Sequence, residues 1–260
     1  MRSGLNHFTR GLCALGLGLG LLLSLTASLR SAQAQTGFQD WSSVVIAADW
    51  RDGQGQPIEA FDNARRDLSR SLLGLGFSSQ HHASLTLNPA KPDHVTPLQA
   101  LEQMGSVSTA ASKGCLFYVT SHGSPANIVF GDTRGLEPAD LSRFLRQWCG
   151  PRPTILILSA CFAGSFVDAL KAPNRLIMTA ASRERSSFGC GAGETYPWYD
   201  ACILQSLPKA THFLDVAAST RDCVRQKETE AQVSPPSDPQ VFIGAEMQMR
   251  LPLLRFTHGP

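Results

Sequence analysis

Two apolar runs in this chain are continuous rather than alternating, and each ends in a reactive side chain. The first covers residues 116–121 and leads into His122 and Gly123, and the second covers residues 154–160 and leads into Cys161. Continuous apolar runs of this length are typical of parallel strands that are buried on both faces. The carboxyl ends of such strands share one edge of the sheet, where α/β proteins bind their ligands. We therefore expect an imidazole and a thiol to meet at that edge.

The segments around these two runs alternate between strand and helix patterns. Further strands are predicted at residues 43–48, 77–87, 175–181 and 240–245, and helices at residues 61–75, from Thr96 onward, at 138–148, at 164–170 and from Trp198 onward. The helix at 61–75 has apolar residues at every third or fourth position, and the one at Thr96 opens with an N-cap, a proline and a capping-box glutamine. This order predicts an α/β fold in which a mostly parallel central sheet carries helices on both faces.

The first 34 residues have the pattern of a secretory signal peptide. A basic, polar start precedes an apolar run from Gly11 to Ala27, and an A-x-A cleavage site ends at Ala34. We predict cleavage after Ala34, export to the periplasm or beyond the cell, and no stable membrane association afterwards. An uncleaved membrane anchor is the alternative, because the apolar run is nearly long enough to span a bilayer. Residues 35–260 then fit one domain, with a core at about 43–245.

Removal of this segment changes the charge of the chain. It holds three arginines and no acidic residue, so the formal charge falls from +2 to −1. The remaining basic residues are densest around Arg65 and between Arg221 and Lys227, where they alternate with acids at helical spacing. That pattern is typical of a solvated helix face, so we expect no nucleic-acid partner.

Six cysteines follow the predicted signal peptide. Disulfides are the usual state of cysteines in an exported protein, but a catalytic Cys161 has to stay free. Cys115 lies inside an apolar strand and is expected to be a buried thiol. The candidates for up to two bridges, of undetermined pairing, are then Cys149, Cys190, Cys202 and Cys223. No pair has C-x-x-C spacing and no H-E-x-x-H occurs, so no metal site is predicted.

His122 and Cys161 have the surroundings that thiol catalysis needs. A thiol is a strong nucleophile only as the thiolate, which a nearby imidazole and a helix N-terminus both favour. Gly123 permits close backbone approach, so its N–H and that of Cys161 can form an oxyanion hole. The alternative is a structural histidine and a buried cysteine, which are common singly. Their joint position at the ends of two neighbouring strands favours an active site.

Three separated motifs in the chain carry a family resemblance. Residues 118–123, residues 158–165 and residues 179–190 resemble the His-Gly, A-C-x-x-G-S and T-A-A-x-x-x-E-S-S-x-x-C signatures of the legumain-like cysteine peptidases, peptidase family C13. The clan of this family includes the caspases. The resemblance covers roughly residues 43–207, and together with the predicted signal peptide it indicates an exported, bacterial type.

The resemblance implies a caspase-like three-layer sandwich with a His/Cys dyad and no cofactor. Cys161 would be the nucleophile, His122 the general base and acid, and Gly123 would contribute its N–H to the oxyanion hole. Asp49, at the end of the first strand, lies near the family's histidine-orienting residue. The implied activity is that of an endopeptidase that cleaves polypeptides through an acyl-thioester. A transpeptidase or transamidase, or a non-catalytic binding domain on the same fold, is the alternative.

The substrate pocket is where the sequence departs from the family pattern. Ser159 stands where asparaginyl members have an acid, two residues before the nucleophile. Ser186 and Ser187 match the pocket wall, and Asp200 matches the later pocket acid. Glu59 lies about where the family has a basic residue. We therefore expect Glu59 and Asp200 to make the S1 pocket acidic, so that it prefers a basic P1 residue to asparagine.

Overall fold

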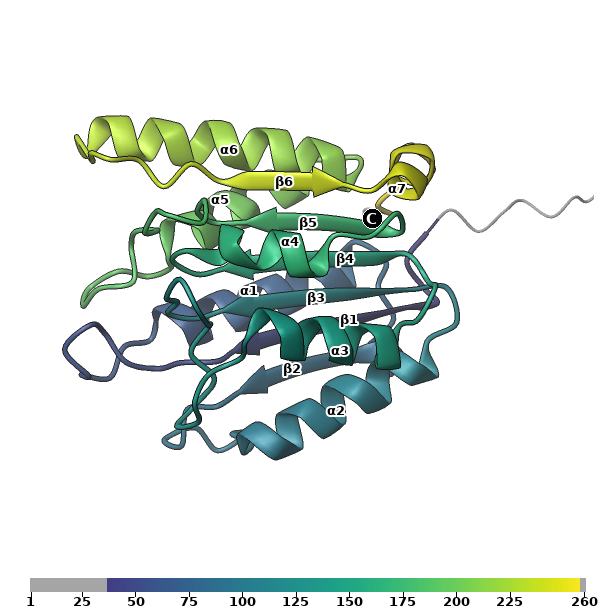
Figure 1. The fold of residues 1–260 in the computed structure, drawn as a ribbon, viewed down its shortest axis with the longest axis horizontal. Coiled ribbons are helices and arrows are strands. Elements are labelled where there is room, and N and C mark those ends of the chain that lie inside the picture. Colours follow the sequence, from purple (N-terminus) through teal and green to yellow (C-terminus); the bar gives the residue numbers. More distant parts are fainter. Residues whose placement is uncertain (1–36, 258–260) are drawn as a thin grey trace, which may run out of the picture. The chain divides into compact units, whose positions relative to one another are not determined.

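The computed structural model of the protein describes residues 37–257, and a mixed β-sheet of six strands runs through this part of the chain (Figure 1). The strands are β1 (Trp41–Ala47), β2 (His82–Thr86), β3 (Gly114–Thr120), β4 (Thr154–Ser159), β5 (Arg175–Thr179) and β6 (Gln240–Ile243), in the order β2-β1-β3-β4-β5-β6. All neighbouring pairs are parallel except β5 and β6, which are antiparallel. The strand order changes direction between β1 and β3, which is the position where open α/β sheets bind ligands.

Helices cover both faces of this sheet, as predicted (Figure 1). One face carries α2 (Pro97–Ala110), α3 (Pro138–Trp148) and α4 (Val167–Leu170), and the other carries α1 (Ala60–Gly74), α5 (Trp198–Ser206), α6 (Phe213–Glu230) and α7 (Ala245–Arg250). Each face has its own buried apolar cluster, because β1, β3, β4 and β5 are buried along their whole length. The predicted three-layer sandwich is therefore confirmed.

The helix boundaries follow from local signals in the sequence. At α2, the Thr96 hydroxyl accepts from the Gln99 N–H at 3.3 Å, and the Gln99 side chain accepts from the Thr96 N–H at 2.9 Å. This capping box satisfies two backbone donors that the first helical turn leaves unpaired. In α1, Phe61, Leu68 and Leu72 point into the core, as the predicted apolar spacing requires.

Two predicted elements differ from the structure. The predicted strand at 77–87 begins with a 3₁₀ turn, Ser79–His81, and only His82–Thr86 pairs with β1, at the edge of the sheet. His81 and His82 are both half-buried, and Nδ1 of His82 lies 2.8 Å from the hydroxyl of Ser43 on β1. The predicted helix at 164–170 is a 3₁₀ turn, Ala163–Phe166, followed by the single turn of α4.

The cysteine pairing also differs from the expectation. Disulfides join Cys115 to Cys149 and Cys202 to Cys223, and Cys161 and Cys190 are free. Cys115 is therefore not a free buried thiol, because its side chain lies on the α3 face of β3, where Cys149 ends that helix. Cys190 was predicted as a bridge candidate, but it lies near the end of β1 in a small apolar cluster with Ala47, Ile58, Ala60 and Phe61.

The predicted signal peptide and its cleavage site lie outside the described residues. Within residues 37–257, none of the helices is both long enough and apolar enough to cross a bilayer.

Candidate active site

The ends of β3 and β4 bring His122 and Cys161 to the same edge of the sheet. Thr120 and Ser159 are paired in the strand register, so the residues that follow them leave the sheet side by side. Gly123 lies so close to the second strand end that an added Cβ would be 2.2 Å from the carbonyl oxygen of Cys161. Only glycine fits there without a backbone shift, so this glycine allows the two strand ends to meet.

The imidazole of His122 is held by a backbone carbonyl from the loop after β1. Its Nε2 lies 2.8 Å from the carbonyl oxygen of Arg51, and its ring packs edge-on against Phe61, with centroids 5.1 Å apart. A carbonyl oxygen can only accept a hydrogen bond, so Nε2 must carry the proton. The other nitrogen, Nδ1, is then the basic one in the neutral ring.

Asp49 organises the loop that supplies this carbonyl. Its carboxylate accepts hydrogen bonds from the N–H groups of Trp50 and Arg51, at 2.8 and 3.3 Å, and from Nε of Arg51 at 2.8 Å. Arg51 also forms an ion pair with Asp132 at 2.8 Å. Asp49 therefore acts on the imidazole indirectly, because its carboxylate fixes the loop that supplies the carbonyl group in contact with His122. Sequence reasoning missed the Arg51 carbonyl because every residue has one.

The sulfur of Cys161 lies among hydrogen-bond donors. The N–H of Ser187 lies 3.2 Å from Sγ, the hydroxyl of Ser187 lies 3.5 Å from it, and the thiol of Cys190 forms a hydrogen bond with it. The bond from Cys190 is the main cause that lowers the pKa of Cys161 to about 5. The bonds from Ser187 and the charge of His122 lower it further, and burial opposes them. The pKa of Cys190 is raised, because its proton is shared with this thiolate.

The turn after Cys161 is fastened to the loop that follows β5. Phe162 has a left-handed backbone, with φ of 58°, and its N–H donates to the carbonyl of Arg185 at 2.8 Å. Gly164 donates to the carbonyl of Ala181 at 3.0 Å. Because the helix expected to begin here is only a 3₁₀ turn, the thiolate is stabilised chiefly by side-chain and loop donors rather than by a long helix dipole.

Asp200 and Ser159 lie beneath the two strand ends, where they are buried. The carboxylate of Asp200 accepts a hydrogen bond from Thr120 at 2.6 Å and others from Tyr118 and Ser159, and none of its surface is exposed. Burial raises the pKa of Asp200 to about 6, although the three hydroxyl donors oppose that change. The acid thus ties β3 to β4 just before His122 and Cys161.

The other three residues expected in the substrate pocket are Ser186, Ser187 and Glu59. Ser187 contacts the sulfur directly, whereas Ser186 beside it is exposed. The carboxylate of Glu59 is paired with Lys91, with Nζ 2.7 Å from both of its oxygens, and its side chain is 56% exposed. This carboxylate is therefore already paired with a lysine at the surface.

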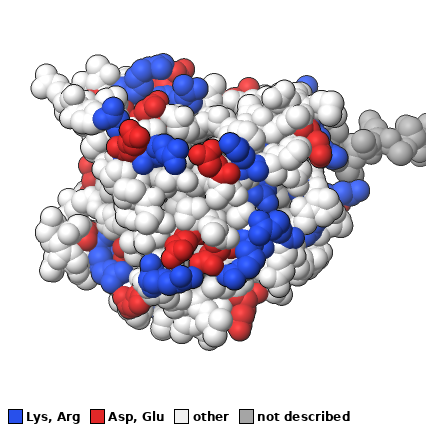
Figure 2. Space-filling view, viewed as in Figure 1, with Lys and Arg blue, Asp and Glu red and all other residues white. Residues whose placement is uncertain are grey.

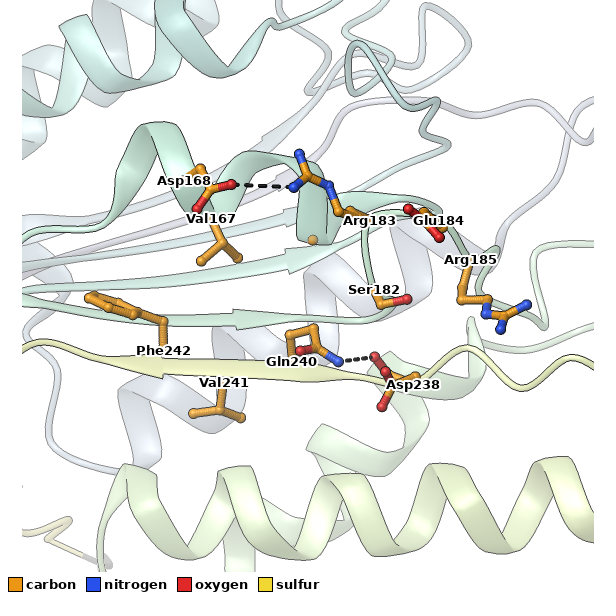
Figure 3. A pocket seen from close by; sticks show the side chains of 11 residues that line it. Val167, Asp168, Ser182, Arg183, Glu184, Arg185, Asp238, Gln240, Val241 and Phe242 are labelled. Carbon is orange, nitrogen blue, oxygen red and sulfur yellow. Dashed lines mark hydrogen bonds and ion pairs between the residues drawn. The ribbon is translucent and has the colours of Figure 1, made fainter.

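A cavity adjoins the far side of the loop after β5. It has a volume of about 620 Å³ and is lined by Gly164, residues 167–168, 182–185, Asp238 and 240–242. Figure 3 shows Arg183 pointing to Asp168, and the side chain of Gln240 bonded to the backbone of Asp238. Because Gly164 is only three residues after Cys161, this space lies next to the nucleophile turn.

No metal site accompanies these groups within residues 37–257, where no cluster of three or more His, Cys, Asp or Glu side chains is placed to hold an ion.

Comparison with known proteins finds one family model and a similar solved structure. The model of the Peptidase C13 family matches residues 100–215, which include every candidate site residue except Asp49 and Glu59. No curated protein sequence matches the chain. Among solved structures, the chain is similar to the crystal structure of caspase-1 from Spodoptera frugiperda, with a TM-score of 0.58 and 11% sequence identity over 82% of this chain and 92% of that one. At this identity the likeness shows the fold alone. The chain therefore has a caspase-like α/β fold, and its residues 100–215 match the model of the Peptidase C13 family.

Proposed function

We propose that the protein is a cysteine endopeptidase in which Cys161 attacks a peptide carbonyl and His122 transfers the protons. The observation that carries this proposal is the sulfur of Cys161, which lies among three donors at the strand end next to His122. With a pKa of about 5, this sulfur is a thiolate at neutral pH and needs no separate step of deprotonation.

In the acylation step, the thiolate sulfur of Cys161 bonds to the carbonyl carbon, and the carbonyl oxygen becomes an oxyanion. Within the described residues, no hydrogen bond uses the N–H of Gly123 or of Cys161 as donor, so both are available to that oxyanion. The protonated imidazole of His122 then gives its Nδ1 proton to the leaving amine as the C–N bond breaks.

In the deacylation step, Nδ1 of His122 accepts a proton from water while the water oxygen attacks the thioester. The new acid leaves and the thiolate returns. Throughout the cycle, the proton stays on Nε2, which donates it in a hydrogen bond to the carbonyl oxygen of Arg51, and this bond keeps the ring in the orientation that both transfers need.

The substrate in this proposal is a polypeptide. The cavity of about 620 Å³ on the far side of the loop after β5 is lined by none of the catalytic residues, so it offers room for substrate residues beyond the scissile bond. Of the two acids proposed to favour a basic P1 residue, Glu59 is paired with Lys91, and Asp200 is fully buried, so Asp200 acts on a P1 cation only through its charge and not by direct contact.

A panel of fluorogenic peptides tests the activity and its specificity together. We expect cleavage after arginine or lysine by the wild-type protein and none by Cys161→Ala. Cleavage after asparagine alone would reject the basic P1 preference, and equal turnover by Cys161→Ala would reject the mechanism. Product analysis with an added amine separates hydrolysis from transpeptidation, since an acyl-thioester can react with either water or an amine.

We also propose export, for which the predicted signal peptide gives the reason and the two disulfides give support. N-terminal sequencing of the protein from its native host should begin at Gln35. An intact Met1 in the accumulated protein would contradict cleavage after Ala34.

A further inference from the structure

A second cavity with basic walls lies at the end of β5 that is remote from Cys161. It has a volume of about 400 Å³, and its charged lining residues are Arg146, Lys171, Arg175 and Glu246. They come from the end of α3, the residue after α4, the start of β5 and the first turn of α7 (Figure 1). Figure 2 shows Lys and Arg side chains gathered between α4 and the end of α3. The lining therefore has a net charge of +2, separate from the catalytic groups.

Arg175 is a buried cation without a counterion. Its side chain is about 5% exposed, and Nη1 donates to the carbonyl of Leu170 at 2.5 Å. Its Nε is buried and has no hydrogen-bond partner among the described residues, and none of their carboxylates lies within ion-pair distance of the guanidinium. A buried charge that is neither paired nor fully hydrogen-bonded is costly.

The neighbouring cations add to this cost. Arg146 donates to the hydroxyl of Ser142 at 2.8 Å and forms no ion pair within residues 37–257. Burial lowers the pKa of Arg175, and the positive charge of Arg146 lowers it further. An arginine nevertheless keeps its proton at neutral pH, so the two charges repel each other across the cavity. Lys171 contributes a third charge, which is held by Asp168 at 3.0 Å in an exposed pair that is weak in water.

We propose that this cavity binds a phosphate or sulfate dianion. Two negative charges match the net charge of the lining, and the several oxygens of such an ion can accept from guanidinium groups on different elements at the same time. A monoanion such as acetate leaves half of this charge unmatched and offers fewer acceptors. Glu246 opposes any anion, so its removal should strengthen binding.

Calorimetric titration of the wild-type protein with inorganic phosphate, sulfate and acetate, at constant ionic strength, tests this site. We expect saturable binding of one phosphate or one sulfate per chain and weaker binding of acetate. Saturable binding of methyl phosphate as well would assign the site to phosphomonoester groups, whereas its failure would assign it to the free ion. The absence of saturable phosphate binding, or equal binding of acetate, would overturn the proposal.

Variants locate the binding in this cavity. Arg146→Gln should weaken phosphate binding about tenfold, because it removes a charged hydrogen-bond donor. Arg143→Gln changes the charge by the same amount on the same helix, away from the cavity, and should leave binding unchanged. Glu246→Gln should strengthen it, and Arg175→Met should abolish it. If Arg175→Met fails to fold, the comparison of Arg146→Gln with Arg143→Gln still tests the proposal. Equal phosphate affinities of these two variants would overturn it.

Discussion

Replacing Cys190 with alanine removes the thiol that bonds to the sulfur of Cys161. This bond is the main cause that lowers the pKa of Cys161 to about 5. A hydrogen bond to a charged group contributes about 1.5–3 kcal/mol, and about 1.4 kcal/mol corresponds to one pKa unit. Loss of the bond should therefore raise the pKa of Cys161 by about one to two. The donors of Ser187 and the charge of His122 remain, so the new pKa should lie at about 6 to 7, still below that of an ordinary thiol.

The rate of alkylation by iodoacetamide measures this pKa directly, since only the thiolate reacts. The rate should be followed as a function of pH, with mass spectrometry to assign the label to Cys161. Cys190→Ser is the matched control, because a hydroxyl still donates and the midpoint should stay nearer 5. Ser186→Ala is a second control, because Ser186 is next to Ser187 but forms no hydrogen bond with the sulfur among the described residues, and it should leave the midpoint unchanged. An unchanged midpoint in Cys190→Ala would refute the assigned cause.

Three further changes test other parts of the account. Gly123→Ala should lower kcat/KM about a hundredfold, because the added Cβ would lie 2.2 Å from the carbonyl oxygen of Cys161. Gly53→Ala is the control and should leave kcat/KM unchanged, because Gly53 has open space around it. Equal kcat/KM values for the two variants would contradict the close approach at Gly123. Asp200→Asn removes a carboxyl group that has its pKa raised to about 6 by burial. In the wild type, the stability that comes from this raised pKa is fully present below about pH 4 and is lost as the pH rises through 6. Denaturant unfolding at pH 4 and pH 7 should show that the free energy of unfolding falls by about 3 kcal/mol more in the wild type than in Asp200→Asn. Equal decreases in the two proteins would contradict the raised pKa of Asp200. Replacing Cys115 and Cys149 together by alanine should lower the free energy of unfolding by about 3–4 kcal/mol, because the bridge closes a long loop; a change near zero in a urea titration would rule this out.

Most of the fold could be predicted from the sequence, because the central strands are continuous apolar runs and α1 and α3 have clear amphipathic spacing. The same pattern put His122 and Cys161 at one sheet edge, since parallel strands share a direction. Elements at the rim were less predictable. The strand that ends in Thr86 is shortened by a 3₁₀ turn, and the segment after Cys161 forms no long helix, because contacts with other loops decide these short pieces.

The details of the site depend on contacts that have no signature in the sequence. The carbonyl of Arg51 holds the imidazole through a backbone atom, which any residue supplies. Cys190 looked like a partner for a disulfide, because spacing alone says nothing of the distance between two side chains in space. The pairing of Glu59 with Lys91, which is 32 residues away in the sequence, likewise has no local signature.

Trapping of the acyl-enzyme tests the central claim most directly. The protein is mixed with a cleavable peptide, quenched in acid and digested, and the fragment that contains Cys161 is weighed by mass spectrometry. We predict a mass increase on Cys161 equal to the acyl part of the substrate, slower to form in His122→Ala and absent in Cys161→Ala. Turnover of the peptide with no adduct on this cysteine, or with undiminished rate in Cys161→Ala, would contradict the account.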